Sequence, residues 1–352
     1  MPTVRTSLLL MLCLALRVGA SPPVAAPRHV PAAAEIYGRS LTADDSYSYQ
    51  GRQITTYWSN GRASAVLVSH RAPYFSRIEY LSPDSQRGRL LVSNSREQWQ
   101  YDGQRRLLLH RVLAKNLPDE DDLTSYNLLR ANYLLAVDPV LRTWADRKAY
   151  LLLVKRIGNH TLARKLWVDA GSGLVLKREI FHEDGKIAVT VAFSDISFRP
   201  NLPRTLFSLA GLAKIPKVRR QELAAQAETL IPLNLVPAQL AGMAAAPTNL
   251  WGYRLVGASD TSVNGTPLLH LQYSDGLNLV SLFEQRRAHA RRPTLVPKAM
   301  RSLRIGKRLG HVGHRASLTT INWDTPTLNL TLMGELAEPT LAQIAVAADG
   351  GR

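Results

Sequence analysis

The sequence contains a single cysteine, Cys13, in 352 residues. The chain can therefore form no internal disulfide, no cysteine zinc site and no Cys-x-x-Cys redox pair. Long apolar runs are also missing. Beyond the N-terminus there is no run of about 18 apolar residues, which excludes a helical membrane-embedded fold. With 45% hydrophobic and 20% charged residues, the composition excludes a disordered chain and predicts a sizeable core.

Recognisable catalytic motifs are absent as well. The sequence has no Gly-x-Ser-x-Gly elbow, no His-Glu-x-x-His helix and no glycine-rich phosphate loop. Of the nine histidines only His311 and His314 are close together, and on a strand a spacing of three places them on opposite faces. A shared metal is therefore disfavoured. We predict a protein that is not an enzyme and needs no cofactor or metal.

Acidic residues are few relative to basic ones. The 44 Lys and Arg against 27 Asp and Glu give a net charge of +17, which predicts anionic partners such as lipid headgroups or acidic protein surfaces. From Arg286 to Arg308 there are nine basic residues and no acid. This stretch is either a solvated loop or an anion-binding face for lipid phosphate or an acidic partner segment. The candidates for such a face are Arg286, Arg287, Arg291, Arg292, Lys298, Arg301 and Arg304.

The first twenty residues have the pattern of a secretory signal peptide. Arg5 supplies a positive start, Leu8–Leu16 an apolar core, and Val18-Gly19-Ala20 small residues for cleavage before Ser21. The apolar core is too short to span a bilayer. We therefore expect an exported protein, which argues against a nucleic-acid partner for the basic charge.

Residues 45–198 have the pattern of an antiparallel sheet of about ten short strands. Gln53–Trp58 and Ala65–His70 flank Asn60-Gly61, which is typical of a tight hairpin turn. One helix is expected at Leu123–Val137, after the acidic run Asp119–Asp122 and before Asp138-Pro139. A sheet of this size is expected to curl or half-close, which hides its edges.

The strand pattern stops near residue 205 and returns later. Six prolines lie within residues 199–247, where we expect a linker with one short helix around Arg219–Leu230. Strands return after residue 248, and a helix-prone segment, Thr340–Ala348, follows them. The predicted organisation is a signal peptide (1–20), a leader (21–44) with a possible short helix at its end, a sheet domain (45–205), a linker (206–247) and a smaller α+β domain (248–340).

Aromatic and aliphatic residues on the expected strands form a candidate ligand surface. Trp99 and Tyr101 are two residues apart and therefore face one way, and neighbouring aliphatic residues can share that side. These residues form either a closed core under the helix or a cavity for a lipid tail, since a lipid pocket is chemically a core with something missing. The candidates are Trp58, Val66, Val68, Ile78, Tyr80, Trp99, Tyr101, Leu107 and Leu109.

Three stretches resemble the MucB/RseB family of sigma-factor regulatory proteins. Tyr49-Gln50-Gly51 leads into the first hairpin, and residues 166–207 resemble the end of a LolA-like domain, with Phe193–Ile196 (FSDI) before a proline-containing exit. Residues 255–285, with a Ser-Asp-Gly-Leu turn followed by a Val-Ser-Leu-Phe strand, resemble the C-terminal domain of these regulators. Carriers of the LolA type lack this second domain, so the length of the chain favours the regulators.

The resemblance implies a mainly β, α+β protein: a half-open antiparallel β-barrel with a capping helix and a concave face that accommodates acyl chains, followed by a smaller α+β domain. It also implies a periplasmic, non-enzymatic regulator of the envelope stress response. Such a regulator binds the extracytoplasmic domain of a membrane-anchored anti-sigma factor, and a lipid or anionic glycolipid relieves that binding. The alternative is a periplasmic lipid or lipoprotein carrier of the LolA type.

Overall fold

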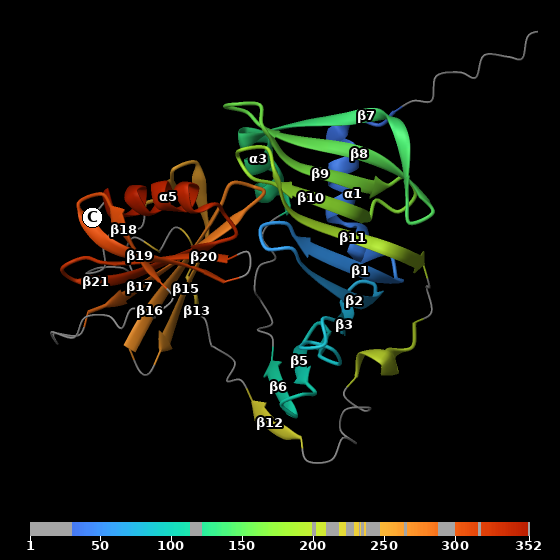
Figure 1. Cartoon of the computed structure of the whole chain (residues 1–352), viewed down its shortest axis with the longest axis horizontal. Coiled ribbons are helices and arrows are strands. Elements are labelled where there is room, and N and C mark those ends of the chain that lie inside the picture. Colours follow the sequence, from blue (N-terminus) through green and yellow to red (C-terminus); the bar gives the residue numbers. More distant parts are fainter. Residues whose placement is uncertain are drawn as a thin grey trace, which may run out of the picture. The chain divides into compact units, whose positions relative to one another are not determined.

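The computed structural model describes residues 30–112, 122–198, 202–208, 218–222, 229–231, 233, 236, 247–263, 266–287, 300–315 and 318–350. The expected signal peptide and most of the expected linker lie outside these residues. Ala32–Arg352 form one compact unit. Its described part is built on two β-sheets (Figure 1). Among the described helices, none combines the length and the apolar composition that crossing a membrane requires.

The first sheet has twelve strands in the order β12-β6-β5-β4-β3-β2-β1-β11-β10-β9-β8-β7. Most neighbours are consecutive in the chain, as the short turns predict, and β1 joins the two halves by pairing with β11. Its strands are β1 (Tyr49–Tyr57), β2 (Arg62–Arg71), β3 (Phe75–Ser82), β4 (Leu90–Ser93), β5 (Glu97–Asp102), β6 (Leu107–Val112), β7 (Tyr133–Trp144), β8 (Arg147–Arg156), β9 (Leu162–Asp169), β10 (Val175–Phe181), β11 (Ile187–Phe198) and β12 (Arg219–Glu222).

Two helices at the start of the described chain belong to the core of this sheet. In α1 (Ala33–Leu41), Ile36 and Tyr37 are buried in one cluster with Leu152 and Val154 of β8. After it, α2 (Ala43–Ser46) contributes Ala43 to a second cluster. Residues of both helices therefore pack into the core of the first sheet.

The expected helix over Leu123–Val137 is wrong in its second half. Helix α3 spans Asp122–Asn132, and the chain continues from Tyr133 directly into β7, which pairs with β8. Pro139 does not stop this segment because β7 is the last strand of the sheet order, and the register is irregular between Asp138 and Arg142. A proline is tolerated at such a position on an edge strand.

The expected helix around Arg219–Leu230 is also wrong where the structure describes it. Arg219–Glu222 form β12, which pairs in parallel with β6, and Thr229–Leu230 form β13. Just before, the 3-10 helix η1 (Arg204–Phe207) buries Phe207 in a cluster with Leu90 and Trp99, and Val218 packs against the same cluster. Described parts of the expected linker thus pack on both sheets, since β12 extends the first sheet and β13 pairs with β15 (Tyr253–Val263) of the second.

The second sheet has nine strands, with the order β13-β15-β16-β17-β21-β20-β19-β18 and β14 paired to β15. Helix α5 (Glu338–Gly350), expected from the sequence, places Leu341 and Ile344 in the same buried cluster as the inner residues of the strands. The remaining strands are β14 (Asn249–Leu250), β15 (Tyr253–Val263), β16 (Thr266–Ser274), β17 (Leu279–Arg286), β18 (Arg301–Ile305), β19 (Arg308–Arg315), β20 (Leu318–Asp324) and β21 (Leu328–Gly334).

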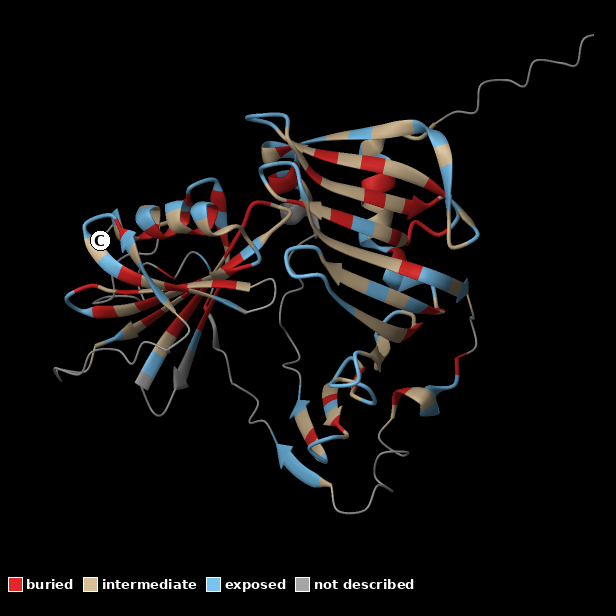
Figure 2. Ribbon diagram, in the orientation of Figure 1, coloured by how far each residue is buried: buried red, intermediate tan, exposed pale blue. Residues whose placement is uncertain are grey.

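The expected fold class is confirmed. The described chain is mainly β, with few helices, and the first sheet ends at β12 on one side and β7 on the other without closing into a barrel. Buried residues form regular bands along the strands of the second sheet and a more scattered pattern on the first (Figure 2). The expected boundaries of the two domains stay a prediction.

Candidate functional site

The strand registers divide the expected lipid-cavity residues between two faces of the first sheet. Val66 lies opposite Tyr80 and Val68 opposite Ile78, and this face continues through Leu91 and Gln100 to Leu109. Trp99 and Tyr101 instead pair with Val92 and Leu90. These residues are neighbours of Leu91 and Gln100 in the chain and therefore lie on the opposite face of the sheet. The face shared by six candidates is that of Val66, Val68, Ile78, Tyr80, Leu107 and Leu109.

This shared face is a closed core at one end and half-exposed at the other. Val68 is buried with Ala43 and Tyr49, and Val66 packs against the same cluster. Farther along the sheet, Ile78, Tyr80, Leu107 and Leu109 are all half-buried. The structure thus brings together aliphatic and aromatic side chains that retain accessible surface on β3 and β6.

The tryptophan candidates lie elsewhere. Trp99 is buried beside Phe207 and stacks on His110, with ring centroids 5.5 Å apart, and Tyr101 packs against the same cluster. Trp58 was expected on a strand but lies in the turn after β1, is 57% exposed, and donates its indole N–H to the Thr190 hydroxyl at 2.9 Å. These three aromatic residues therefore do not extend the face of Val66 and Ile78.

The expected basic face is partly neutralised by α5. Arg301 forms an ion pair with Glu338, and Arg308 forms one with Asp349 at 2.7 Å. Arg287 donates to the Thr325 carbonyl oxygen at 3.2 Å, whereas Arg286 and Arg304 are exposed. Arg291, Arg292 and Lys298 lie outside the described residues.

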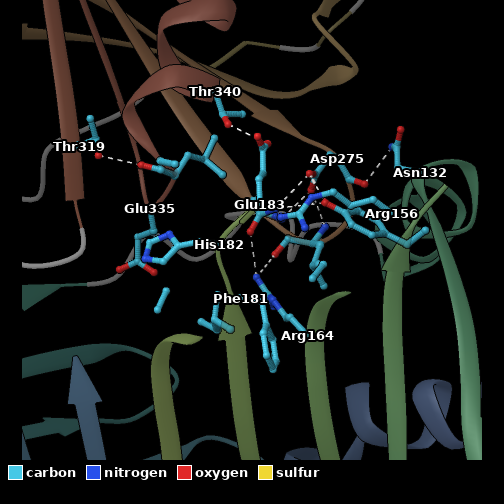
Figure 3. A pocket seen from close by; sticks show the side chains of 18 of the residues that line it. Asn132, Arg156, Arg164, Phe181, His182, Glu183, Asp275, Thr319, Glu335 and Thr340 are labelled. Atoms are coloured by element: carbon cyan, nitrogen blue, oxygen red, sulfur yellow. Dashed lines mark hydrogen bonds between the residues drawn. The ribbon is translucent and has the colours of Figure 1, made fainter. Parts of the chain in front are cut away.

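A cavity of about 1060 Å³ is lined by residues of both sheets (Figure 3). Its walls combine apolar side chains with polar and charged ones, and polar groups in a pocket fix the orientation of a bound ligand. The lining includes Tyr57, Ser59, Asn132, Tyr133, Arg156, Asn159, Arg164, Ile180, Phe181, His182, Glu183, Val189, Trp251, Tyr253, Asp275, Leu277, Asn278, His314, Thr319, Glu335, Leu336, Glu338 and Thr340.

A polar network at one side of the cavity joins the two sheets. The Tyr133 hydroxyl donates to the Asp275 carboxylate at 2.6 Å, and the Asn132 amide donates to the Asp275 carbonyl oxygen at 3.0 Å. Asn278 donates to the same carboxylate at 3.0 Å. Burial, reinforced by the neighbouring Asp275 charge, raises the pKa of Tyr133 well above its ordinary value, so this phenol stays neutral and donates.

The turn that carries Asp275 fits closely against α3. Asp275 accepts hydrogen bonds from the backbone N–H groups of Leu277 and Asn278 at 2.9 and 2.7 Å, which shapes the turn. Gly276 has a φ of +88°, and a Cβ added there would lie 2.1 Å from the backbone N of Leu129. Only glycine combines this conformation with so close an approach. The Ser-Asp-Gly-Leu turn is thus the contact point of the second sheet with α3.

Arg164 on β9 is a half-buried cation in the wall of the cavity. Its Nη2 donates to the Leu277 carbonyl oxygen and to Asn278 Oδ1, the latter at 3.1 Å. Its Nε is buried and has no hydrogen-bond partner among the described residues. Burial, together with the like charge of Arg178, lowers the pKa of the Arg164 guanidinium to about 10, so it remains protonated at neutral pH.

The opposite wall is acidic but its groups are engaged. Glu183, in the turn after β10, accepts a hydrogen bond from Thr340 of α5 at 2.9 Å. Glu338 pairs with His314 at 3.0 Å as well as with Arg301. Among the described residues no group of three or more His, Cys, Asp or Glu side chains is placed to hold a metal ion.

One sequence motif pointed to this site. The Ser-Asp-Gly-Leu turn, which carries part of the family resemblance, contributes Asp275 and Leu277 to the cavity. The other lining residues come from separate segments of both sheets, and neither their spacing nor their type marks them as a site. Asn132 and Tyr133 fell within the segment expected to be a helix.

Comparison with known proteins agrees with this architecture. A crystal structure of MucB in complex with MucA(peri) matches with a TM-score of 0.55 and 18% identity over 90% of this chain and 98% of that chain. The complex structure of Pseudomonas aeruginosa MucA/MucB matches with 0.56 and 18% over 89% and 97%, and a crystal structure of MucB alone with 0.50 and 19% over 90% and 96%. These likenesses concern the fold.

Family membership rests on the sequence. No curated protein sequence matches the chain. The family model of the MucB/RseB N-terminal domain matches residues 33–224, more than half of the chain, and begins where α1 begins. The chain therefore belongs to the MucB/RseB family.

Proposed function

We propose that this protein is exported to the periplasm and binds the extracytoplasmic segment of a membrane-anchored anti-sigma factor, without catalysing a reaction. One observation carries the proposal: the fold matches MucB, in structures solved with MucA, over about nine tenths of this chain. Membership of the MucB/RseB family supports the same partner class.

The cavity is the place where such a segment would bind. An extended peptide carries backbone donors and acceptors along its whole length and needs polar partners beside each apolar side chain. The cavity offers both kinds of group, with apolar side chains such as Phe181 and Ile180 near amides such as Asn159 and Asn278. Both sheets contribute to its walls, which fits a partner held by the second domain with help from the first.

A lipid is the proposed signal that relieves this binding. The half-buried face of Ile78, Tyr80, Leu107 and Leu109 supports an acyl-chain site on the first sheet. Each buried methylene would contribute about 0.8 kcal/mol, so a long acyl chain could bind there despite the cost of ordering it.

The test is titration of the purified mature protein with the exported domain of a single-pass anti-sigma factor, sought first among the genes beside its own. Saturable binding by calorimetry, reversed by an anionic glycolipid or phospholipid, is the expected result. Absence of binding together with lipid transfer to acceptor vesicles would instead identify a carrier of the LolA type.

A further inference from the structure

Arg164 contains an unused hydrogen-bond donor in the most specific part of the cavity. The two bonds of its Nη2 fix the guanidinium in place, while its buried Nε has no acceptor among the described residues. A buried N–H without an acceptor destabilises the fold, and more so in a charged group. The unpaired donor of Arg164 therefore suggests that a bound ligand supplies a hydrogen-bond acceptor to this side chain.

The charge of Arg164 is compensated only in part, by the nearby Asp275 carboxylate, which raises the pKa of Arg164 against the larger opposite effect of burial. No described carboxylate forms an ion pair with it. Asp275 is nearby, but its carboxylate accepts from Tyr133 and Asn278. Glu338 is held by Arg301 and His314. The acids of the cavity are therefore engaged elsewhere, and a ligand that brings its own negative charge would gain most at Arg164.

The walls around Arg164 favour a peptide over an acyl chain as the source of that charge. The Asn159, Asn278 and Thr319 side chains line the cavity, as do the histidines His182 and His314. An acyl chain would leave these polar groups without partners, whereas the backbone of an extended peptide can satisfy them.

We propose that Arg164 determines the specificity of this cavity by pairing with an acidic side chain of the bound anti-sigma segment. The inference rests on the proposed function, since it names the feature of the segment that the cavity recognises. The guanidinium of Arg164 would donate to the aspartate or glutamate carboxylate in a charge-assisted hydrogen bond. Because Nη2 is already engaged by Leu277 and Asn278, the segment would meet a guanidinium fixed in orientation.

The experiment uses overlapping peptides that cover the exported domain of the anti-sigma factor found to bind in the titration above, measured by fluorescence anisotropy against the whole protein. In the peptide that binds most tightly, each Asp is replaced by Asn and each Glu by Gln. One such replacement should weaken binding to the wild type by at least about tenfold, the lower range for a buried charged pair. Against Arg164→Gln the same replacement should change affinity less than about twofold.

Two further variants separate recognition from structure. Tyr133→Phe also removes a hydrogen bond between the sheets, but leaves Arg164 intact. It should weaken the acidic peptide and its amide form equally. Arg164→Lys keeps the charge without the Nε–H and should retain only part of the discrimination. If Arg164→Gln does not fold, this lysine variant and the peptide replacements still decide the question.

Three results would overturn the inference. The first is equal binding of acidic and amide peptides by the wild type. The second is full discrimination kept by Arg164→Gln, and the third is an equal loss of discrimination in Tyr133→Phe. Absence of any peptide or domain binding to the wild type would overturn the proposed function as well. That outcome is distinct from binding that is insensitive to the acid.

Discussion

The two sheets of this molecule bury their side chains in different ways. In the second sheet, β20 and β21 alternate strictly between buried and half-buried residues, and the inner residues form one continuous cluster with α5. In the first sheet, all eight residues of β3 are half-buried, and the apolar core is divided among three clusters. One sheet is solidly packed, whereas the other leaves apolar surface partly accessible between its clusters.

This difference indicates where ligands can bind. A close-packed core has no room for a guest without the cost of opening it. The continuous cluster of the second sheet therefore serves to hold α5 and to position the Ser274–Asn278 turn. Ligand sites are to be expected where packing is interrupted: along β3 and β6, and in the cavity lined by both sheets.

The largest effect should come from removing a side chain of the continuous core. Leu282 on β17 is fully buried, so Leu282→Ala should lower the free energy of unfolding by about 2–5 kcal/mol. Ile78 on β3 is half-buried, so Ile78→Ala removes less apolar area from contact and should cost about 1 kcal/mol. Urea unfolding followed by circular dichroism measures both. Equal losses would show that the first sheet is as tightly packed as the second.

The next effect concerns the turn that contacts α3. Gly276 and Gly252 have nearly the same positive φ, +88° and +87°, but a Cβ at Gly252 would meet nothing within 4 Å. Alanine at either position should cost about 1–2 kcal/mol through the left-handed backbone. Gly276→Ala should cost clearly more, because the clash with Leu129 involves backbone atoms that no side-chain rotation relieves.

Thermal unfolding and hydrogen exchange of the α3 amides measure this comparison. Gly276→Ala should speed exchange in α3, while Gly252→Ala leaves it unchanged. If the two variants behaved alike, the turn would contribute only its own conformation, and the close contact with α3 would have no energetic role.

The sequence predicted the strands better than the elements between them. The hairpin around Asn60-Gly61 is confirmed because its turn chemistry is local: Gly61 has a φ of +65°, as a tight turn needs. Tyr133–Val137 was wrongly expected to be helical. A short apolar run fits a helix or a buried strand equally well. Pairing with β8 decides in favour of the strand, and the sequence of this segment alone does not reveal that pairing.

The cavity was beyond sequence reasoning for the same physical cause. Arg164 lies on a strand among ordinary basic residues, and its significance comes from burial and from the Leu277 carbonyl 113 residues away. Only the Asp275-Gly276 turn has local chemistry that a motif can capture. Val66 and Trp99 lie on opposite faces of the sheet because of the pairing registers of β2 to β5. These registers cannot be read from the sequence.

A smaller effect is expected from the tyrosine that joins the sheets. Tyr133→Phe leaves the buried Asp275 carboxylate with one donor fewer and should cost about 1–3 kcal/mol at neutral pH. Because burial raises the pKa of Tyr133, the folded state favours the neutral phenol. That stabilisation is complete below the ordinary tyrosine pKa of about 10 and is lost as pH rises above it.

Wild-type stability should therefore decline above about pH 10, and Tyr133→Phe should decline less steeply. Some alkaline decline must remain, because burial also raises the pKa of Tyr49 in the first sheet and of Tyr253 in the second. Urea titrations of Tyr49→Phe and Tyr133→Phe between neutral pH and pH 11 measure how much each tyrosine contributes to the alkaline loss of stability. The comparison separates the contribution of Tyr49 in the first sheet from that of the Tyr133–Asp275 network. Identical slopes in wild type and Tyr133→Phe would contradict this assignment.

The smallest effect distinguishes two arginines of β18. Arg301 is held by Glu338, whereas Arg304 is exposed and has no ion-pair partner among the described residues. Arg304→Glu should change stability by less than about 0.5 kcal/mol, and Arg301→Glu should lose up to about 1 kcal/mol with its exposed ion pair.

Binding to vesicles that contain an anionic phospholipid should show the reverse order. Arg304→Glu should weaken it more per charge, since Arg301 is already neutralised, and the effect should fade as salt rises because the Debye length is only about 8 Å at physiological ionic strength. A stronger loss of vesicle binding for Arg301→Glu would mean that Glu338 does not hold this arginine in solution.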